Sequence, residues 1–349
     1  IFLCICFFSL ILNFEHTNIK IFLIQIKNYL LPYLIFYIGC SLYNLAKFKN
    51  FINYFLIFSL ILSIIGIIEF LLSKHFYLVY GVFGNPLGIN PFRSYSLIGN
   101  PVDFGFFLMF PLIFSYISKK NKIFSFLFLA SIFFTKSIGC FLTIFILLIT
   151  SLYFKILSKK NITLFLILGL ILISTDNNFK SRILLKKNNT ENLNYLDEAS
   201  RYDYYLQTSK VVKDNLFLGV GAGNYGGWVS DKGNYFYSLY NIDMKGLNSI
   251  DIFYPHLIAE TGLFGFFAFI MIYLSIIRKN FSYMRYYKKQ NDSFGYSISV
   301  SVFLYGIALL SSGFWSMFLE TNFSTILFFF ISAFSSSYFN LKYKNYETV

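Results

Sequence analysis

The chain has 349 residues, of which 56% are hydrophobic and 13% are charged, and its mean hydropathy is +0.61. Soluble domains contain about 25% charged residues, so this composition excludes an ordinary water-soluble fold. The net charge of +13 would suggest a nucleic-acid partner in a soluble protein. Here, however, the basic residues lie in short linkers between apolar runs, as in the cytoplasmic loops of membrane proteins. We therefore expect an all-α polytopic membrane protein that has no nucleic-acid partner.

The apolar runs predict the membrane-spanning helices. A helix that crosses a bilayer needs roughly 20 mainly apolar residues. Because the chain begins inside an apolar pattern at Ile1, we expect further N-terminal residues and up to 12 spans in the full-length protein. The two segments on either side of Thr135–Gly139 are also compatible with one bent helix or a re-entrant hairpin. About ten spans are predicted in this chain, at residues 1–13, 29–46, 51–72, 102–118, 123–135, 138–155, 162–175, 254–277, 294–315 and 323–340.

The basic clusters predict the orientation of these spans. Lysine and arginine concentrate on the cytoplasmic side of membrane proteins, and an even number of predicted spans separates each cluster from the next. Segments 73–101 and 176–253 then face the periplasm, and the C-terminus is cytoplasmic. We expect an N-terminal bundle at residues 1–175, a large periplasmic loop at 176–253 and C-terminal helices at 254–349. The clusters are Lys47/Lys49, Lys119/Lys120/Lys122, Lys155/Lys159/Lys160, Arg278/Lys279/Arg285/Lys288/Lys289 and Lys342/Lys344.

The first polar cluster precedes the span predicted at 102–118. Arg93 is followed by the turn Gly99-Asn100-Pro101, which opens directly into that span. Backbone N–H groups at a helix N-terminus bind anions, and an arginine can clamp a phosphate with two hydrogen bonds. The alternative interpretation is that Arg93 merely lies at the level of the lipid headgroups.

The large loop contains a second cluster, on a helical pattern that begins at Ser200, a residue type suited to an N-cap. Arg201 follows in the first turn, where the helix dipole disfavours a cation, so it needs an anionic partner such as Asp203, a lipid phosphate or a substrate. Loops of this length are usually functional or disordered, and this pattern predicts a folded, mainly helical loop.

A glycine-rich run follows that helical pattern. It has neither the spacing nor the flanking strands of a dinucleotide site, so we interpret it as a tight turn that packs closely on another element. The four cysteines lie in apolar segments without metal-ligand spacing, and we expect no metal site and no cofactor. The glycines of the run are Gly219, Gly221 and Gly223.

The third cluster opens the span predicted at 254–277. Asp251 lies just before it, Pro255 is tolerated in its first turn, and His256 and Glu260 are spaced to share one helix face. Ionisable groups at such depth are costly and indicate function. The alternative is a His256–Glu260 pair that only fixes neighbouring helices.

The fourth cluster contains Lys136, which is predicted near the periplasmic surface between two spans. A lysine there departs from the cytoplasmic bias of basic residues. It either extends to the membrane surface or lines a polar cavity, with Glu320 as a possible partner.

In order and content, these clusters resemble the O-antigen ligase/Wzy-type polymerase superfamily of bacterial envelope glycosyltransferases. The resemblance covers about residues 90–275 by motif. The chain departs from the ligase pattern at Asp251-Ile252, where ligases carry His-Asn, and this favours a repeat-unit polymerase. The matching motifs are Arg93 with Gly99-Asn100-Pro101 to Gly105, Ser137-Ile138-Gly139, Arg201, Gly219 to Tyr225, and Asp251, Tyr254, Glu260, Gly262 and Gly265.

The resemblance implies a GT-C-like fold in the bacterial inner membrane and polymerisation of oligosaccharide repeat units that are linked to undecaprenyl pyrophosphate. Arg93, Asn100, Arg201 and Tyr205 would bind the pyrophosphate. Asp251 would be the general base, with His256 and Glu260 as the next candidates. The glycines Gly219, Gly221, Gly223 and Gly262 would be structural.

Membrane lipids and a chain-length regulator protein are candidate partners. A ligase would transfer the same carrier-linked glycan to lipid A-core or another acceptor. A flippase or transporter is the alternative from another functional class, although the sequence lacks the internal repeats typical of transporters.

Overall fold

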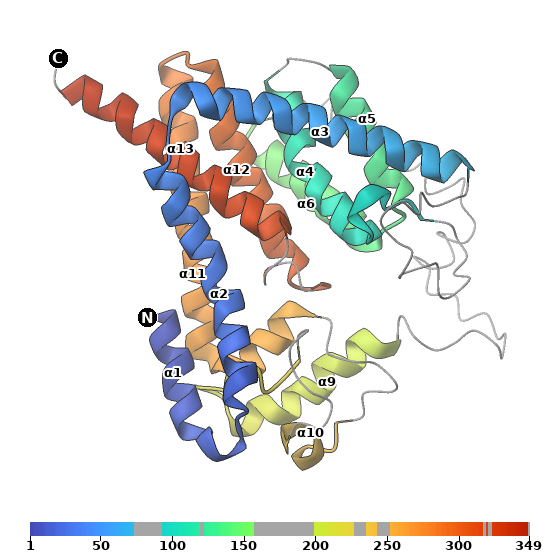
Figure 1. Cartoon of the computed structure of the whole chain (residues 1–349), viewed down its shortest axis with the longest axis vertical. Helices are drawn as coiled ribbons and strands as arrows, with labels where there is room; N and C mark the ends of the chain where they lie inside the picture. The colour runs from blue at the N-terminus through green and yellow to red at the C-terminus, as the bar shows by residue number, and fades with distance from the viewer. Residues whose placement is uncertain are drawn as a thin grey trace. The chain divides into compact units, whose positions relative to one another are not determined.

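The computed structural model describes residues 1–72, 93–118, 122–156, 199–226, 235–242, 252–316, 319 and 323–347. Every regular element in these ranges is a helix (Figure 1). The elements are α1 (Phe2–Leu12), η1 (Phe14–His16), α2 (Ile19–Ser41), α3 (Leu45–Leu72), η3 (Ser96–Ile98), α4 (Pro101–Ile117), α5 (Lys122–Phe134), α6 (Ile138–Tyr153), α9 (Ala199–Asp214), α10 (Tyr235–Leu239), α11 (Phe253–Lys289), α12 (Ser293–Ser312) and α13 (Phe323–Glu347).

Five described helices, α2, α3, α11, α12 and α13, are long and apolar enough to cross a membrane. Four shorter apolar helices, α1, α4, α5 and α6, accompany them. This supports a multi-pass membrane protein, whereas the count of about ten spans, the periplasmic loop and the orientation stay predictions. The span predicted at 162–175 lies outside the described residues.

Most of the predicted ends agree with the helices within one or two residues, but at least one end of α2, α3, α11, α12 and α13 differs by more, and the differences are largest in α2 and α11. The helix α2 begins at Ile19 instead of residue 29, and α11 continues to Lys289 instead of ending at 277. In both cases charged residues end the apolar run, but lysine and arginine are good helix formers, so the helical backbone continues through them. The helices α5 and α6 are separate, joined through residues 135–137.

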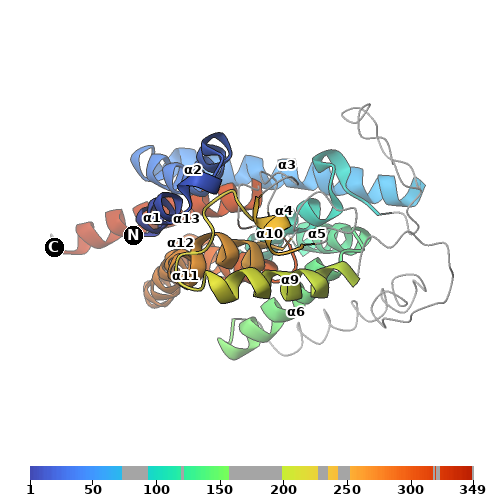
Figure 2. The ribbon, with the colours of Figure 1, turned by 90° about the horizontal axis from the view of Figure 1, so that it is seen from below.

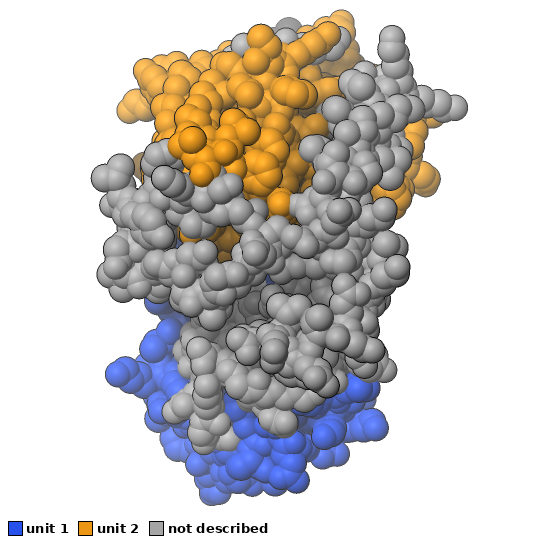
Figure 3. Space-filling model, turned by 90° about the vertical axis from the view of Figure 1, so that its right-hand side faces the viewer, with its two compact units in different colours: residues 1–38, 190–276, 309–330 blue, residues 39–189, 277–308, 331–349 orange. Residues whose placement is uncertain are grey.

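The described chain divides into two compact units, which Figure 3 colours blue and orange. Unit 1 comprises Ile1–Ile38, Thr190–Ile276 and Leu309–Phe330, and unit 2 comprises Gly39–Asn189, Ile277–Ala308 and Ile331–Val349. Each unit therefore combines segments that are far apart in the sequence. The division of the chain at residues 175 and 253 stays a prediction.

The helix α4 lies at the centre of unit 2, where it packs against α3, α5 and α6 (Figures 1 and 2). Asn100 caps it by accepting a hydrogen bond from the Val102 N–H at 2.8 Å, Pro101 occupies its first position, and Asp103 lies in its first turn. All three residue types favour a helix N-terminus. Every residue from 104 to 115 is buried.

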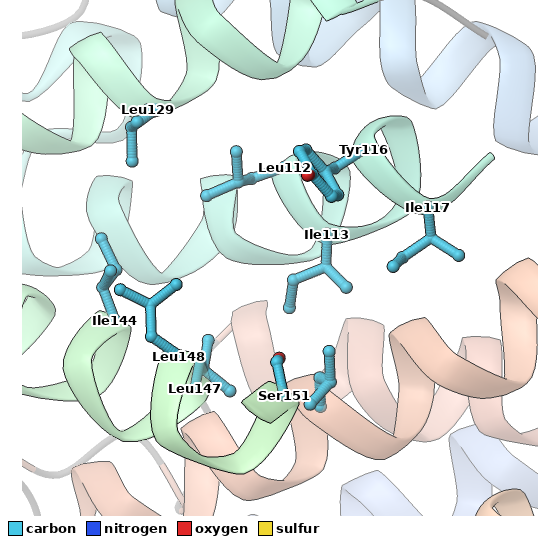
Figure 4. Close-up of a pocket in the computed structure, with 10 residues that line it drawn as sticks. Leu112, Ile113, Tyr116, Ile117, Leu129, Ile144, Leu147, Leu148 and Ser151 are labelled. Carbon is cyan, nitrogen blue, oxygen red and sulfur yellow. The ribbon is translucent and has the colours of Figure 1, made fainter. Parts of the chain in front are cut away.

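A small cavity of about 60 Å³ lies beside α4 in the same unit (Figure 4). Leucine and isoleucine side chains make up most of its wall, together with Tyr116 and Ser151, and no charged side chain lines it. Apolar cavities of this kind stay dry, so we interpret it as a packing gap between helices.

The close contact between α4 and α6 generates a stability prediction. A Cβ atom on Gly105 would lie 2.4 Å from the Cys140 Sγ, so Gly105→Ala should lower the free energy of unfolding by about 1–3 kcal/mol through overpacking. In a Cys140→Ala background the same change should be neutral or stabilising, because alanine favours helix more than glycine does. Thermal unfolding in detergent measures both effects. An equal melting shift in both backgrounds would contradict the packing argument.

Candidate functional site

The helix α11 is interrupted at Gly262, where φ is 64° and ψ is −172°. A break in a helix leaves carbonyl groups of the first half and N–H groups of the second half without helical partners. Such groups are costly to leave unpaired in a membrane protein, where other parts of the chain must satisfy them.

The glycine turn, which we define as residues 215–226, supplies the missing partners. Its carbonyls accept hydrogen bonds from the second half of α11, and its N–H groups donate to the first half. We call this reciprocal set the clasp. Its four bonds are Leu263 N–H to Leu216 O (2.8 Å), Phe264 N–H to Phe217 O (3.3 Å), Val220 N–H to Ala259 O (2.9 Å) and Gly221 N–H to Glu260 O (3.0 Å).

The clasp explains why glycine is required both in the glycine turn and at the break in α11. Gly219 has a φ of 69°, and a Cβ there would lie 2.4 Å from the backbone carbon of Glu260. A Cβ on Gly262 would lie 2.2 Å from the backbone carbon of Phe217. The glycine run is therefore a tight turn packed against another element, which confirms that interpretation of the sequence.

The Glu260 side chain joins the same arrangement. It is completely buried, and its Oε1 accepts hydrogen bonds from the N–H groups of Gly223 at 2.7 Å and Tyr225 at 3.3 Å. Its Oε2 accepts a hydrogen bond from the Tyr29 hydroxyl at 3.0 Å. A buried carboxylate is stable only when such donors surround it, so Glu260 and the glycine turn depend on each other.

His256 lies one helical turn before Glu260 and is also completely buried. Its Nδ1 is 2.5 Å from the Tyr225 carbonyl oxygen and 3.7 Å from the Glu260 Oε1. Because a carbonyl oxygen only accepts hydrogen bonds, Nδ1 carries a proton. The Nε2 faces the Tyr29 hydroxyl at 3.2 Å and the Gln25 amide nitrogen at 3.3 Å. The predicted shared face of His256 and Glu260 is confirmed.

Residues of α2 and of the α1–α2 connection were missed by the sequence analysis. Besides Gln25 and Tyr29, Asn13 donates a hydrogen bond to the Gly219 carbonyl at 3.3 Å, and Thr17 accepts one from the Asn224 amide at 2.7 Å. The only signal in the sequence was a polar residue, Gln25, within an apolar run.

Tyr225 lies at the end of the glycine run, and its ring is fully buried. Its hydroxyl lies 2.9 Å from the Thr208 hydroxyl on α9. Burial raises the pKa of the Tyr225 phenol well above its usual value, so the group stays protonated at neutral pH. This contact attaches α9 to the glycine turn.

The helix α9 carries two of the predicted pyrophosphate-binding residues. Arg201 is in its first turn, as predicted. The helix begins at Ala199, so Ser200 lies inside it and the prediction of Ser200 as its N-cap was wrong. Tyr205 follows one turn later on the same face; it is exposed, and its hydroxyl donates to the Phe314 carbonyl at 2.9 Å. The Arg201 side chain and the whole of Asp251 lie outside the described part of the chain.

In unit 2, Arg93 is half-buried and its Nε donates a hydrogen bond to the Thr135 carbonyl at 2.9 Å. The ammonium of the adjoining Lys136 lies 5.2 Å from the centre of the Phe70 ring. Its suggested partner Glu320 is outside the described residues. Asn100 is exposed and caps α4, so part of its hydrogen-bonding capacity is already used within the protein.

The predicted site residues therefore fall into two groups, and their chemical roles stay predictions. Unit 1 contains Tyr205, the glycines of the clasp, His256 and Glu260. His256, Glu260 and the clasp lie together. Arg93 and Asn100 belong to unit 2.

The clasp generates a second prediction. Gly262→Ala or Gly219→Ala should lower the free energy of unfolding by roughly 2–4 kcal/mol, since each combines left-handed strain with overlap against backbone. Ala222→Gly, in the same turn, is the control and should cost about 1 kcal/mol or less. Melting temperatures of the detergent-solubilised proteins measure the difference. A Gly262→Ala protein that melts at the wild-type temperature would refute the clasp.

One comparison with known proteins covers part of these residues. A family model described as O-antigen ligase matches residues 123–270. The matched stretch contains α5, α6, α9, the glycine turn and the interruption at Gly262. The search of the curated proteins found no match to the chain.

Proposed function

We propose that this chain belongs to the O-antigen ligase/Wzy superfamily and is a membrane glycosyltransferase that polymerises oligosaccharide repeat units carried on undecaprenyl pyrophosphate. The family match supports an enzyme of the O-antigen ligase type in general. The structural observation that supports the proposal is the clasp, because it joins two of the motifs that resemble this superfamily, the glycine run and the segment from Glu260 to Gly262, into one buried arrangement.

The proposed reaction moves a glycan from one carrier to another at the outer face of the bacterial inner membrane. A hydroxyl oxygen of the non-reducing-end sugar attacks the anomeric carbon of the donor glycan. The bond from that carbon to the pyrophosphate oxygen breaks, undecaprenyl pyrophosphate leaves with the electron pair, and the hydroxyl proton passes to a general base.

Arginines are suited to the leaving group in this reaction. Negative charge develops on the pyrophosphate as the bond breaks, and fixed cationic donors stabilise such charge most in the transition state. We assign this role to Arg93 and Arg201, with Asn100 and Tyr205 as additional hydrogen-bonding groups. The bond from Arg93 to Thr135 supports the assignment, because it restricts the orientation of the guanidinium.

Burial argues against two of the three candidates for the general base. A base must come within about 3 Å of the hydroxyl that it deprotonates. His256 and Glu260 are both completely buried, and their hydrogen bonds hold the first turns of α11 and the glycine turn together. We therefore assign the base to Asp251 and give His256 and Glu260 positioning roles.

This assignment predicts different outcomes for two conservative substitutions. Asp251→Asn should lower turnover about 10²–10⁴-fold, the usual contribution of a general base. Glu260→Gln keeps an oxygen that can accept the two backbone N–H groups, so it should reduce turnover much less, while Glu260→Ala should lower the yield of folded protein. Turnover of a carrier-linked repeat unit and the yield of solubilised protein are the measurements. If Glu260→Gln lowered turnover more than Asp251→Asn, Glu260 would be the base instead of Asp251.

The arginine assignment predicts a change of product. Arg201→Ala should reduce transfer about 10²–10³-fold, as expected for loss of one transition-state donor, and cells should accumulate single repeat units instead of a ladder of chain lengths. Lys210→Ala, on the same helix and exposed, is the matched control. Gel analysis of the polysaccharide and immunoblotting of membranes report product and insertion. A normal ladder in Arg201→Ala would remove Arg201 from the site.

A ligase is the second candidate, because the matched family is described as O-antigen ligase. It would use the same carrier-linked donor with lipid A-core or another acceptor. Deletion distinguishes the two functions, because cells without a ligase retain carrier-linked polymer whereas cells without a polymerase retain single units. A chain-length regulator partner and the inner-membrane location belong to the polymerase proposal.

A further inference from the structure

Glu69 is a carboxylate within α3, one of the helices long and apolar enough to cross a membrane. Its side chain is only 1% exposed. Ionisable groups in such helices are costly and are generally retained for a function. The reaction proposed above gives Glu69 no role.

The contacts of Glu69 lead to the segment that follows Arg93. Its Oε2 accepts hydrogen bonds from the backbone N–H groups of Ser96 at 2.7 Å and Tyr95 at 3.3 Å. Two further bonds attach the same segment to the same face of α3. The Ser94 hydroxyl donates to the Gly66 carbonyl at 2.8 Å, and the Ser96 hydroxyl donates to the Leu62 carbonyl at 2.9 Å.

The surface of α3 is shaped for this close approach. A Cβ atom on Gly66 would lie 2.7 Å from the Ser94 hydroxyl oxygen, so a larger residue would push the segment away. Ser96 has a φ of 51°, a left-handed conformation that costs a non-glycine residue about 1–2 kcal/mol. Strained residues persist where several contacts determine them, and Glu69 supplies the shortest contact to the Ser96 backbone.

The end of α5 also holds the segment. The Ser94 N–H donates to the Phe134 carbonyl at 3.0 Å, and the Arg93 Nε donates to the Thr135 carbonyl at 2.9 Å. The backbone next to Arg93 is therefore fixed between two helices, and Glu69 is the charged acceptor among these contacts.

We propose that Glu69 is a positioning residue for Arg93. Glu69 fixes the backbone of residues 94–96, and this backbone holds the Arg93 guanidinium in one orientation. Its effect on transfer rests on the proposed pyrophosphate-binding role of Arg93, whereas its effect on the conformation of the segment does not. Serine or asparagine at the same place would supply a neutral acceptor. The carboxylate makes a stronger, charge-assisted bond to backbone N–H groups.

A double-mutant cycle tests whether Glu69 acts through Arg93. Glu69→Leu, which keeps the side-chain volume but leaves no acceptor, should reduce transfer about tenfold or more, and Glu69→Gln should reduce it less, because neutral hydrogen bonds are weaker than charge-assisted ones. In an Arg93→Ala background neither change should reduce transfer further, since residues that act as a unit are not additive. Glu15→Leu, at an exposed glutamate, is the matched control.

Trypsin provides a readout that does not depend on activity, because it cleaves after arginine. In detergent-solubilised protein, cleavage after Arg93 should be about tenfold faster or more in Glu69→Leu than in the wild type, because the loss of the hydrogen bonds to the carboxylate favours local opening of the segment. It should be unchanged in Glu15→Leu. Glu69→Gln should fall between them and replaces Glu69→Leu if that variant does not fold.

The two readouts separate the possible failures. Equal cleavage rates in wild type, Glu69→Leu and Glu69→Gln would overturn the positioning role. Additive losses of transfer for Glu69 and Arg93 would also overturn it. Faster cleavage in Glu69→Leu together with full activity of Arg93→Ala would support the positioning of the segment and contradict the proposed function of Arg93.

Discussion

The interruption of α11 at Gly262 is the constraint on which unit 1 depends. A broken helix exposes peptide groups that an apolar environment does not satisfy, and the glycine turn satisfies them through the clasp. Each of the four bonds contributes about 1 kcal/mol net, but leaving one of these groups buried and unpaired would cost more. The break and the turn are therefore two halves of one structure, and neither would be stable alone.

Each unit uses the same device to hold a loop that bears proposed site residues. In unit 1 the buried Glu260 carboxylate accepts backbone N–H groups of the glycine turn, and in unit 2 the buried Glu69 carboxylate accepts those of residues 95 and 96. A carboxylate can accept hydrogen bonds from several nearby N–H groups, and these charge-assisted bonds fix the loop backbone more strongly than bonds to a neutral acceptor. In the proposed function these two acids position the site, while Arg93, Arg201 and Asp251 carry the chemistry.

Hydropathy predicted most helix ends well, because apolar length and local signals such as Asn100-Pro101 determine them. The four-residue spacing of His256 and Glu260 was likewise sufficient to place both on one face. Periodicity carries no information on tertiary partners. The hydrogen bond from the Tyr29 hydroxyl to Glu260 and the contacts of Glu69 were therefore not predicted. The interpretation of the glycine run as a packed turn was correct, but only the structure identifies its partner as the break in α11.

The most direct test of the polymerase account is a reconstituted reaction. The purified protein, in liposomes that contain one undecaprenyl-pyrophosphate-linked repeat unit as the only glycan, should form products of two, three and more units and release undecaprenyl pyrophosphate in proportion to the bonds formed. The account is contradicted if the repeat unit stays unextended with the wild-type protein and is consumed only after lipid A-core or another acceptor is added.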